Sequence, residues 1–176
     1  MAAPMNSENP AAGSSWQFAR RAESTEGRFA SVGSVRGITR LPRTFLDSNI
    51  LLYCDDSANS AKQVRAVELV LEHQRQKTGV VSLQVLQEYF VNATRKLGVD
   101  AALARQKVEI YTRFHVVEPT ISDVLAAIDL HRLHGFSYWD ALIIHCTKQA
   151  GCRELLSEDM QRGQAINGVR IVNPFI

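Results

Sequence analysis

The stretch Thr44–Tyr53, TFLDSNILLY, decides how the chain is organised. Three uncharged residues that suit a strand precede Asp47 and an apolar run follows it, so this carboxylate is expected at the end of a short buried strand. A carboxylate in so apolar a segment is costly unless it is paired, hydrogen-bonded or bound to a metal. Taken alone, Asp47 also suits the cap of a helix or turn beginning at Ser48 or Asn49. Residues further along the chain decide between these interpretations.

Length and composition indicate one folded domain. The chain has 176 residues, of which 45% are hydrophobic, and this is enough for a sizeable core. Residues 1–43 hold six of the 20 basic and three of the 18 acidic residues, which leaves 14 basic and 15 acidic residues in 44–176. Because the folded part is nearly neutral, a nucleic-acid partner would be held by local basic patches.

The remaining composition signals concern order and location. Residues 1–43 are rich in Ala, Ser, Gly and Arg and carry no sustained hydrophobic period, so we expect them to be disordered. Cys54, Cys146 and Cys152 are odd in number and scattered in apolar surroundings, which suits reduced thiols. No run approaches the roughly 18 apolar residues of a membrane span, and the N-terminus lacks a signal-peptide core. We therefore expect a soluble cytoplasmic protein without a membrane part.

Short apolar strands alternate with long amphipathic helices after Pro42. This alternation predicts an α/β fold with a mainly parallel sheet, in which each helix leaves the carboxyl end of a strand. Gly79 is interpreted as the stop signal of the first long helix. The expected strands are 44–47, 79–81, 115–117, 153–157 and 169–172, and the expected helices are 60–76, 82–97, 100–114, 122–133 and 137–150. The buried side of helix 100–114 is expected to hold Ala101, Leu103, Ala104, Val108 and Tyr111.

Four acids fall on the carboxyl edge of this sheet by position alone. Two follow the first and fourth strands and two lie early in helices; they are Asp47, Glu88, Asp140 and Asp159. Asp140 has an alternative interpretation, because an acid three residues after Ser137 fits a capping box. Its apolar neighbours make a simple dipole contact a poor explanation. Other acids, Asp55 among them, are expected to be solvated.

Carboxylates gathered in one cleft repel each other. Two of them ~4 Å apart repel by roughly 4 kcal/mol at an effective dielectric of ~20, so either their pKa values rise or a cation sits among them. Carboxylate oxygens suit Mg²⁺ or Mn²⁺, and the matching chemistry is attack by metal-activated water on a phosphodiester. A zinc site is disfavoured because no cysteine pair has the two-residue spacing of structural zinc motifs; its candidate ligands would be His131, His134, His145, Cys146 and Cys152.

Several segments resemble PIN domains, and most closely the VapC-type toxin ribonucleases of bacterial toxin–antitoxin pairs. They are FLDSNILLY (45–53), LQEYF (86–90), GFSYWDALIIHCTKQAGC (135–152) and LLSEDMQRG (155–163). The resemblance covers about 44–176 and implies a three-layer α/β/α fold with a five-stranded sheet in the order 3-2-1-4-5. It also implies an acidic metal site formed by Asp47, Glu88, Asp140 and Asp159. Ser157 would be a supporting hydroxyl, and its spacing favours Asp159 over Glu158 as the last acid.

The resemblance further implies a Mg²⁺- or Mn²⁺-dependent endoribonuclease that is restrained by a cognate antitoxin and forms a homodimer. The alternatives are a PIN nuclease of RNA processing without an antitoxin, and a non-catalytic RNA-binding module. Apolar residues near Val64, Val67 and Leu71 are expected to face another chain. A last group of basic residues is expected to be solvated surface, with RNA phosphate contacts as the alternative: Arg95, Lys96, Arg105 and Lys107.

Overall fold

A computed structural model describes residues 41–160 and 163–176 of the chain. The expectation that residues 1–43 are disordered therefore falls almost wholly outside the described residues. No helix in the described ranges is both long and apolar enough to cross a membrane.

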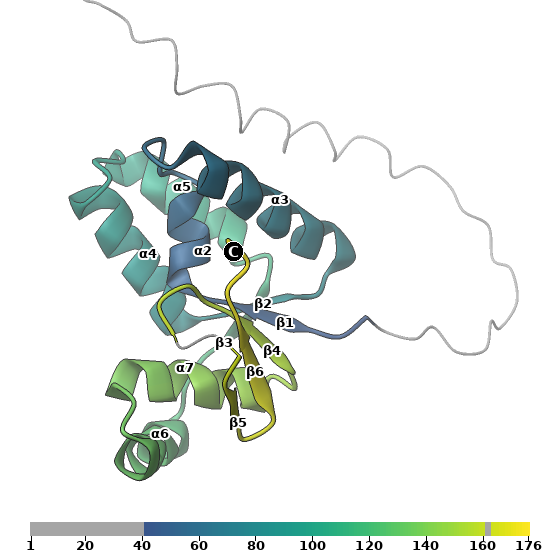
Figure 1. Cartoon of the computed structure of the whole chain (residues 1–176). Coiled ribbons are helices and arrows are strands. Elements are labelled where there is room, and N and C mark those ends of the chain that lie inside the picture. Colours follow the sequence, from purple (N-terminus) through teal and green to yellow (C-terminus); the bar gives the residue numbers. More distant parts are fainter. Residues whose placement is uncertain (1–40, 161–162) are drawn as a thin grey trace, which may run out of the picture. The chain divides into compact units, whose positions relative to one another are not determined.

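One sheet forms the centre of the described chain. Its strands are β1 (Thr44–Leu46), β2 (Gly79–Ser82), β3 (His115–Val117), β4 (Glu154–Leu156), β5 (Ala165–Ile166) and β6 (Val169–Val172). They lie in the order β3-β2-β1-β4-β6-β5, and all neighbouring pairs are parallel except β5 with β6 (Figure 1). The expected order of five parallel strands is confirmed, with β6 in the fifth place.

The short strand β5 was not expected from the sequence. It pairs with β6 in an antiparallel hairpin whose two turn residues, Asn167 and Gly168, have φ angles of 50° and 87°. Positive φ at both central residues is the conformation of a type I′ turn, and Asn-Gly is its preferred sequence. The Asn-Gly pair was therefore an available signal for a hairpin in this otherwise polar segment.

Helices cover both faces of the sheet, which confirms the three-layer α/β/α architecture. On one face lie α2 (Ser48–Tyr53), α3 (Ser60–Gln76), α4 (Leu83–Arg95) and α5 (Ala101–Tyr111), and on the other lie α6 (Ile121–His134) and α7 (Tyr138–Gln149) (Figure 1). Side-chain caps define the helix starts: Ser82 accepts the Val85 N–H. At α6, Thr120 and Asp123 form a capping box, so this helix begins one residue before the expected Ser122.

Gly79 does not end α3 as expected. The left-handed residue is Lys77, with φ of 55°, and Gly79 instead opens β2. A Cβ at Gly79 would lie 2.5 Å from the ring of Phe114. The glycine is therefore required by close packing against an aromatic ring that comes from a distant part of the chain.

A buried ion pair contradicts two expectations about surface charge. Lys107 on α5 pairs with Asp55, which follows α2, and their side chains are only 4% and 7% exposed. Asp55 also accepts a 2.7 Å hydrogen bond from the Tyr89 hydroxyl. The expectation that Asp55 and Lys107 are solvated is wrong, because packing of α4 and α5 against α2 covers both. The buried residues of α5 are Ala104, Lys107 and Tyr111, whereas Ala101 and Leu103 are exposed.

Candidate active site

The register between β1 and β4 brings the first two site residues together. Leu46 pairs with Leu156 at the carboxyl ends of these parallel strands. The next residues, Asp47 and Ser157, therefore leave the sheet side by side. The Asp47 N–H donates to the Leu156 carbonyl at 3.0 Å, and the Ser157 hydroxyl donates to Asp47 Oδ2 at 2.7 Å. Asp47 is only 5% exposed and Ser157 is fully buried, so this pair forms the base of the site.

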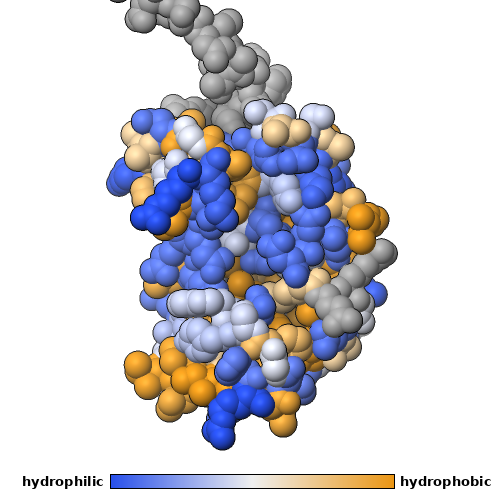
Figure 2. Space-filling view, turned by 60° about the vertical axis from the view of Figure 1, so that its left-hand side comes forward, coloured by the Kyte–Doolittle hydropathy of each residue, from blue (hydrophilic) through white to orange (hydrophobic). Residues whose placement is uncertain are grey.

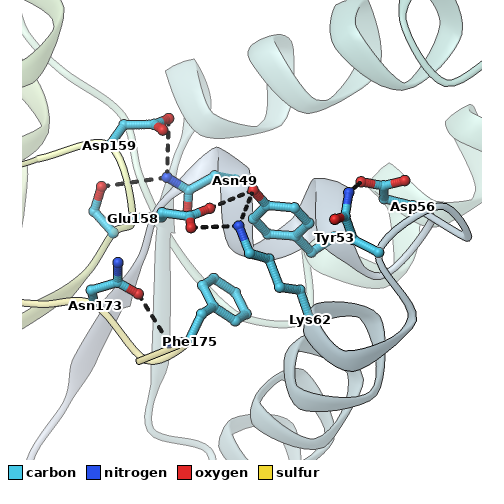
Figure 3. A network of polar contacts seen from close by, with 10 residues as sticks. Asn49, Tyr53, Asp56, Lys62, Glu158, Asp159, Asn173 and Phe175 are labelled. Atoms are coloured by element: carbon cyan, nitrogen blue, oxygen red, sulfur yellow. Dashed lines mark hydrogen bonds and ion pairs between the residues drawn. The ribbon is translucent and has the colours of Figure 1, made fainter.

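Asn49, in the first turn of α2, connects this pair to Asp159. Its Nδ2 lies 3.2 Å from Asp47 Oδ2 and 3.4 Å from Ser157 Oγ. The same Nδ2 lies 3.2 Å from Asp159 Oδ2 (Figure 3). Asn49 is 7% exposed, and its buried Oδ1 has no hydrogen-bond partner among the described residues. The local sequence indicates only a helix start at Asn49, although a polar residue in so apolar a stretch is a signal for a buried polar contact.

Glu88 reaches the same region from α4. Its Oε2 accepts a 2.8 Å hydrogen bond from the Ser48 hydroxyl, and its Oε1 accepts a 2.7 Å bond from Gln84 Nε2. Ser48 is the residue after Asp47, and its backbone N–H donates to Asp47 Oδ1 at 2.6 Å. Ser48 thus donates hydrogen bonds to two acids, from its hydroxyl to Glu88 and from its backbone N–H to Asp47.

The electrostatics of Asp47 reflect both its burial and these neighbours. Burial raises the pKa of Asp47 from 3.8 to about 6, and the hydrogen bonds from Ser157 and Ser48 oppose this rise. The negative charges of Glu88 and Asp159 raise the pKa further. Glu88 and Asp159 therefore both lie near enough to act on Asp47 as like charges.

Asp140 is not tied to this group by any contact between described residues. It lies in the first turn of α7, where its backbone N–H donates to the Ser137 hydroxyl at 3.1 Å. This is one half of the expected capping box; we find no hydrogen bond from residues 41–160 or 163–176 to its carboxylate. The structure brings together Asp47, Glu88, Asp159 and Ser157, and the participation of Asp140 stays a prediction.

Two adjacent acids after β4 have different partners. Asp159 accepts from Asn49, whereas Glu158 accepts from Lys62 at 2.5 Å and from the Tyr53 hydroxyl (Figure 3). Glu158 is thus bonded by Tyr53 on α2 and Lys62 on α3, whereas Asn49 donates to Asp159. This contrast agrees with the assignment of Asp159, rather than Glu158, from the spacing to Ser157.

The side chains of this site suit a hard divalent cation. In the described ranges, no three acidic, His or Cys side chains lie close enough together to enclose an ion. Hard cations such as Mg²⁺ keep several waters and bind through one or two carboxylates, so a complete protein cage is not required. The available donors are carboxylate oxygens and the buried Asn49 Oδ1, which has no hydrogen-bond partner among the described residues. His145 Nε2 lies 2.8 Å from Asp123 Oδ1 and is not part of this group. The donor chemistry therefore fits.

This chain belongs to the PIN domain family, because the family model matches residues 44–161, more than half of its length. Similar solved structures include the Mycobacterium tuberculosis protein VapC20, a toxin that cleaves the sarcin–ricin loop. It is 21% identical, with a TM-score of 0.56, and the match covers 66% of this chain and 89% of that one. A search of curated proteins returns no match.

Two toxin–antitoxin complexes are also similar. One is from Klebsiella pneumoniae, at 18% identity and a TM-score of 0.56, covering 74% of this chain and 97% of that chain. The other is VapBC2 from Rickettsia felis bound to a promoter DNA fragment, at 14% identity and a TM-score of 0.53, covering 73% and 96%. At these identities the likeness establishes the fold, and activity and partners have to be argued from the site.

Proposed function

We propose that this chain is a Mg²⁺- or Mn²⁺-dependent endoribonuclease and the toxin of a toxin–antitoxin pair. The observation that carries the proposal is the buried Asp47 carboxylate, with Glu88 and Asp159 beside it, at the carboxyl ends of β1 and β4, between which the strand order reverses. Doubly wound sheets bind their ligands at this position. Like charges gathered around a buried acid favour a divalent cation.

Each residue of the site has a role in this proposal. Asp47, Glu88, Asp140 and Asp159 would hold the ion, which supplies an activated water and neutralises charge on the phosphodiester. Ser157 fixes the Asp47 carboxylate by its hydrogen bond, and Asn49 aligns Asp47 with Asp159. Gln84 and Ser48 fix the two oxygens of Glu88. Such supporting hydrogen bonds orient ligands for a metal and contribute to its affinity.

The substrate and the inhibitor are proposed from site charge and from similar structures. The Mycobacterium tuberculosis toxin cleaves the sarcin–ricin loop, which supports RNA as the substrate class here. Arg95 and Lys96 are exposed at the end of the helix that carries Glu88 and could hold phosphates. Lys107 is excluded from this role because it is buried. An antitoxin arginine that reaches Asp47 or Asp140 would inhibit by pairing with the carboxylate and displacing the ion.

A homodimer is proposed from exposed apolar surface. On α3, Val64 and Leu71 are exposed and Val67 is half-buried. A second set lies over α6 and α7, where Figure 2 shows hydrophobic side chains gathered at the lower part of the molecule. Contiguous apolar surface of this kind marks protein–protein contacts. The exposed members of this set are Ile121, Leu125, Ile128, Leu133 and Trp139.

The test of the enzymatic proposal compares the full chain with Asp47→Asn. RNA is incubated with each protein in the presence of Mg²⁺, Mn²⁺ or a chelator, and cleavage is followed over time. We expect metal-dependent cleavage by the unaltered chain and its loss in Asp47→Asn. Asp129→Asn, which changes an exposed acid on α6, is the matched control and should cleave normally. Equal cleavage by Asp47→Asn and the unaltered chain would contradict the proposal.

A further inference from the structure

Four residues next to the acidic site form a cluster that the proposed chemistry does not use. Lys62 on α3, Tyr53 on α2, Glu158 after β4 and Phe175 near the C-terminus meet at one point (Figure 3). The Lys62 ammonium donates to Glu158 Oε1 at 2.5 Å and to the Tyr53 hydroxyl at 3.0 Å, and Tyr53 donates to Glu158 Oε2. Both oxygens of Glu158 are therefore occupied. We name this cluster the Glu158 latch.

Aromatic packing adds the C-terminal segment to the latch. The ring of Phe175 packs edge-on against Tyr53, with centroids 4.9 Å apart and an interplanar angle of 72°. The Lys62 ammonium lies 4.7 Å from the Tyr53 centroid and 5.8 Å from the Phe175 centroid, within the range of cation–π attraction. The Phe175 N–H donates to Asn173 Oδ1 at 2.9 Å, a local hydrogen bond within the C-terminal segment. One lysine thus contacts an acid and two rings from three separate segments.

The Glu158–Lys62 pair is partly shielded from water. The two side chains are 21% and 34% exposed. Lys62 and Tyr53 each donate a hydrogen bond to the Glu158 carboxylate, one to each oxygen. The carboxylate is therefore held in this position by one cation and one hydroxyl. Charge-assisted hydrogen bonds to both oxygens also fix its direction.

The latch matters because of the residue next to Glu158. Asp159 is exposed, and among the described residues its carboxylate is held by the 3.2 Å bond from Asn49. Its direction therefore depends on the backbone of the same short segment that Glu158 anchors. A released Glu158 would bring a second, longer carboxylate to the edge of a site where Asn49 and Ser48 already connect Asp159 and Glu88 to Asp47. Like charges so close together repel each other.

We propose that Lys62, Tyr53 and Phe175 are positioning residues that hold Glu158 out of the acidic site, so that Asp159 is the acid facing Asn49 and Asp47. This inference rests on the proposed metal-dependent function. It explains why Asp159, and not the adjacent Glu158, faces the acidic site. Release of Glu158 should place competing charge beside Asp159. The effect of breaking the latch should therefore depend on the charge of Glu158.

The test combines Lys62→Met with Glu158→Gln in the full chain. Lys62→Met removes the ammonium but keeps most of the stem, and Glu158→Gln can still accept a hydrogen bond from Lys62. We expect Lys62→Met to lower Mn²⁺-dependent RNA cleavage at least tenfold and to change Mn²⁺ affinity by calorimetry. Glu158→Gln alone should change cleavage less than twofold, and adding it to Lys62→Met should restore cleavage to within threefold of the unaltered chain. Lys148→Met, on the exposed end of α7, is the control.

The rescue separates positioning from simple stabilisation. A purely structural role of Lys62 predicts that the double variant is as impaired as Lys62→Met, and this result would overturn the latch. Circular dichroism and hydrogen exchange of residues 157–160 and 173–176 report on the segments without metal; we expect faster exchange in Lys62→Met and unchanged exchange in Lys148→Met. If the unaltered chain binds no Mn²⁺ and cleaves no RNA, the proposed function fails and the positioning role with it. Normal binding with a failed rescue overturns the latch alone.

Discussion

Ser157 and Asp47 are 110 residues apart in sequence, yet the Ser157 hydroxyl donates a 2.7 Å hydrogen bond to the Asp47 carboxylate. The contact follows from the parallel pairing of β1 with β4, which aligns Leu46 with Leu156 and places the next two residues together. It supplies the buried carboxylate with a donor that partly offsets the loss of water. The stability of the folded chain and its affinity for metal should both respond to changes in this pair.

Asp47→Asn should stabilise the metal-free protein at neutral pH. The pKa of Asp47 is about 6 in the folded chain, above its ordinary 3.8, so the folded state binds the extra proton between these values. The contribution of Asp47 to the free energy of unfolding therefore falls as pH rises from about 4 to about 6, by about 3 kcal/mol in all. Asparagine removes this pH dependence. Urea unfolding of both proteins with chelator, at pH 5 and pH 7.5, should show a larger gain for the variant at pH 7.5; a loss of stability at pH 7.5 would contradict this prediction.

Ser157→Ala should lower both the stability of the folded chain and its affinity for Mn²⁺. The hydroxyl lowers the pKa of Asp47, so its removal should raise that pKa further and destabilise the ionised form. We expect a loss of about 1–3 kcal/mol in unfolding free energy at pH 7.5, as for a buried group left without its partner, together with weaker Mn²⁺ binding. Ser57→Ala, at an exposed loop position, is the control. Unchanged Mn²⁺ binding in Ser157→Ala would argue against a supporting role.

Asn49→Ala should reduce cleavage without unfolding the chain. The amide is the shared donor to Asp47, Ser157 and Asp159, so its loss frees Asp159 and removes the alignment of the two acids. Loss of such a supporting residue typically costs about 10–100-fold in metal affinity or activity. The measurement is kcat/KM for RNA across a Mn²⁺ series, with the exposed Asn59→Ala as control. Activity within twofold of the unaltered chain would show that Asn49 is dispensable.

Removing one partner of the buried Asp55–Lys107 pair should cost more stability than removing one partner of an exposed pair. Lys107→Met leaves Asp55 buried without its cation and should cost about 3–5 kcal/mol in unfolding free energy. Combining Lys107→Met with Asp55→Leu should recover much of this loss, because no unpaired charge then remains buried. For the exposed Arg105–Glu109 pair, Arg105→Ala should cost less than about 1 kcal/mol. Equal costs for the two single variants would contradict the burial argument.

Phosphate contacts can be tested separately from cleavage. If Arg95 and Lys96 hold the RNA backbone, changing both to Ala should flatten the plot of log affinity against log salt by roughly one unit per lost contact. The Asp47→Asn background keeps the RNA intact during the measurement. Arg132→Ala, on the opposite side of the sheet in α6, is the control. An unchanged slope would assign Arg95 and Lys96 to ordinary surface.

Strands, helices and their order along the chain follow from local sequence patterns. Contacts between side chains from distant segments do not. Alternating strands and helices were enough to place Asp47 and Asp159 at one sheet edge, because parallel strands end on the same side. The contacts of Asn49 do not follow from the local sequence, because two of its partners, Ser157 and Asp159, are more than a hundred residues away. The burial of Lys107 was missed for a similar reason, since its charge is matched only after α5 packs against the end of α2.

The most direct test of the central claim is Mn²⁺ binding to the purified full chain, measured by calorimetry at pH 7.5 for the unaltered protein, Asp47→Asn and Asp129→Asn. We predict binding by the unaltered protein and by Asp129→Asn, and its loss in Asp47→Asn, because the buried Asp47 carboxylate is the centre of the acidic site. The absence of Mn²⁺ binding in the unaltered protein, or equal binding in Asp47→Asn, would contradict the claim.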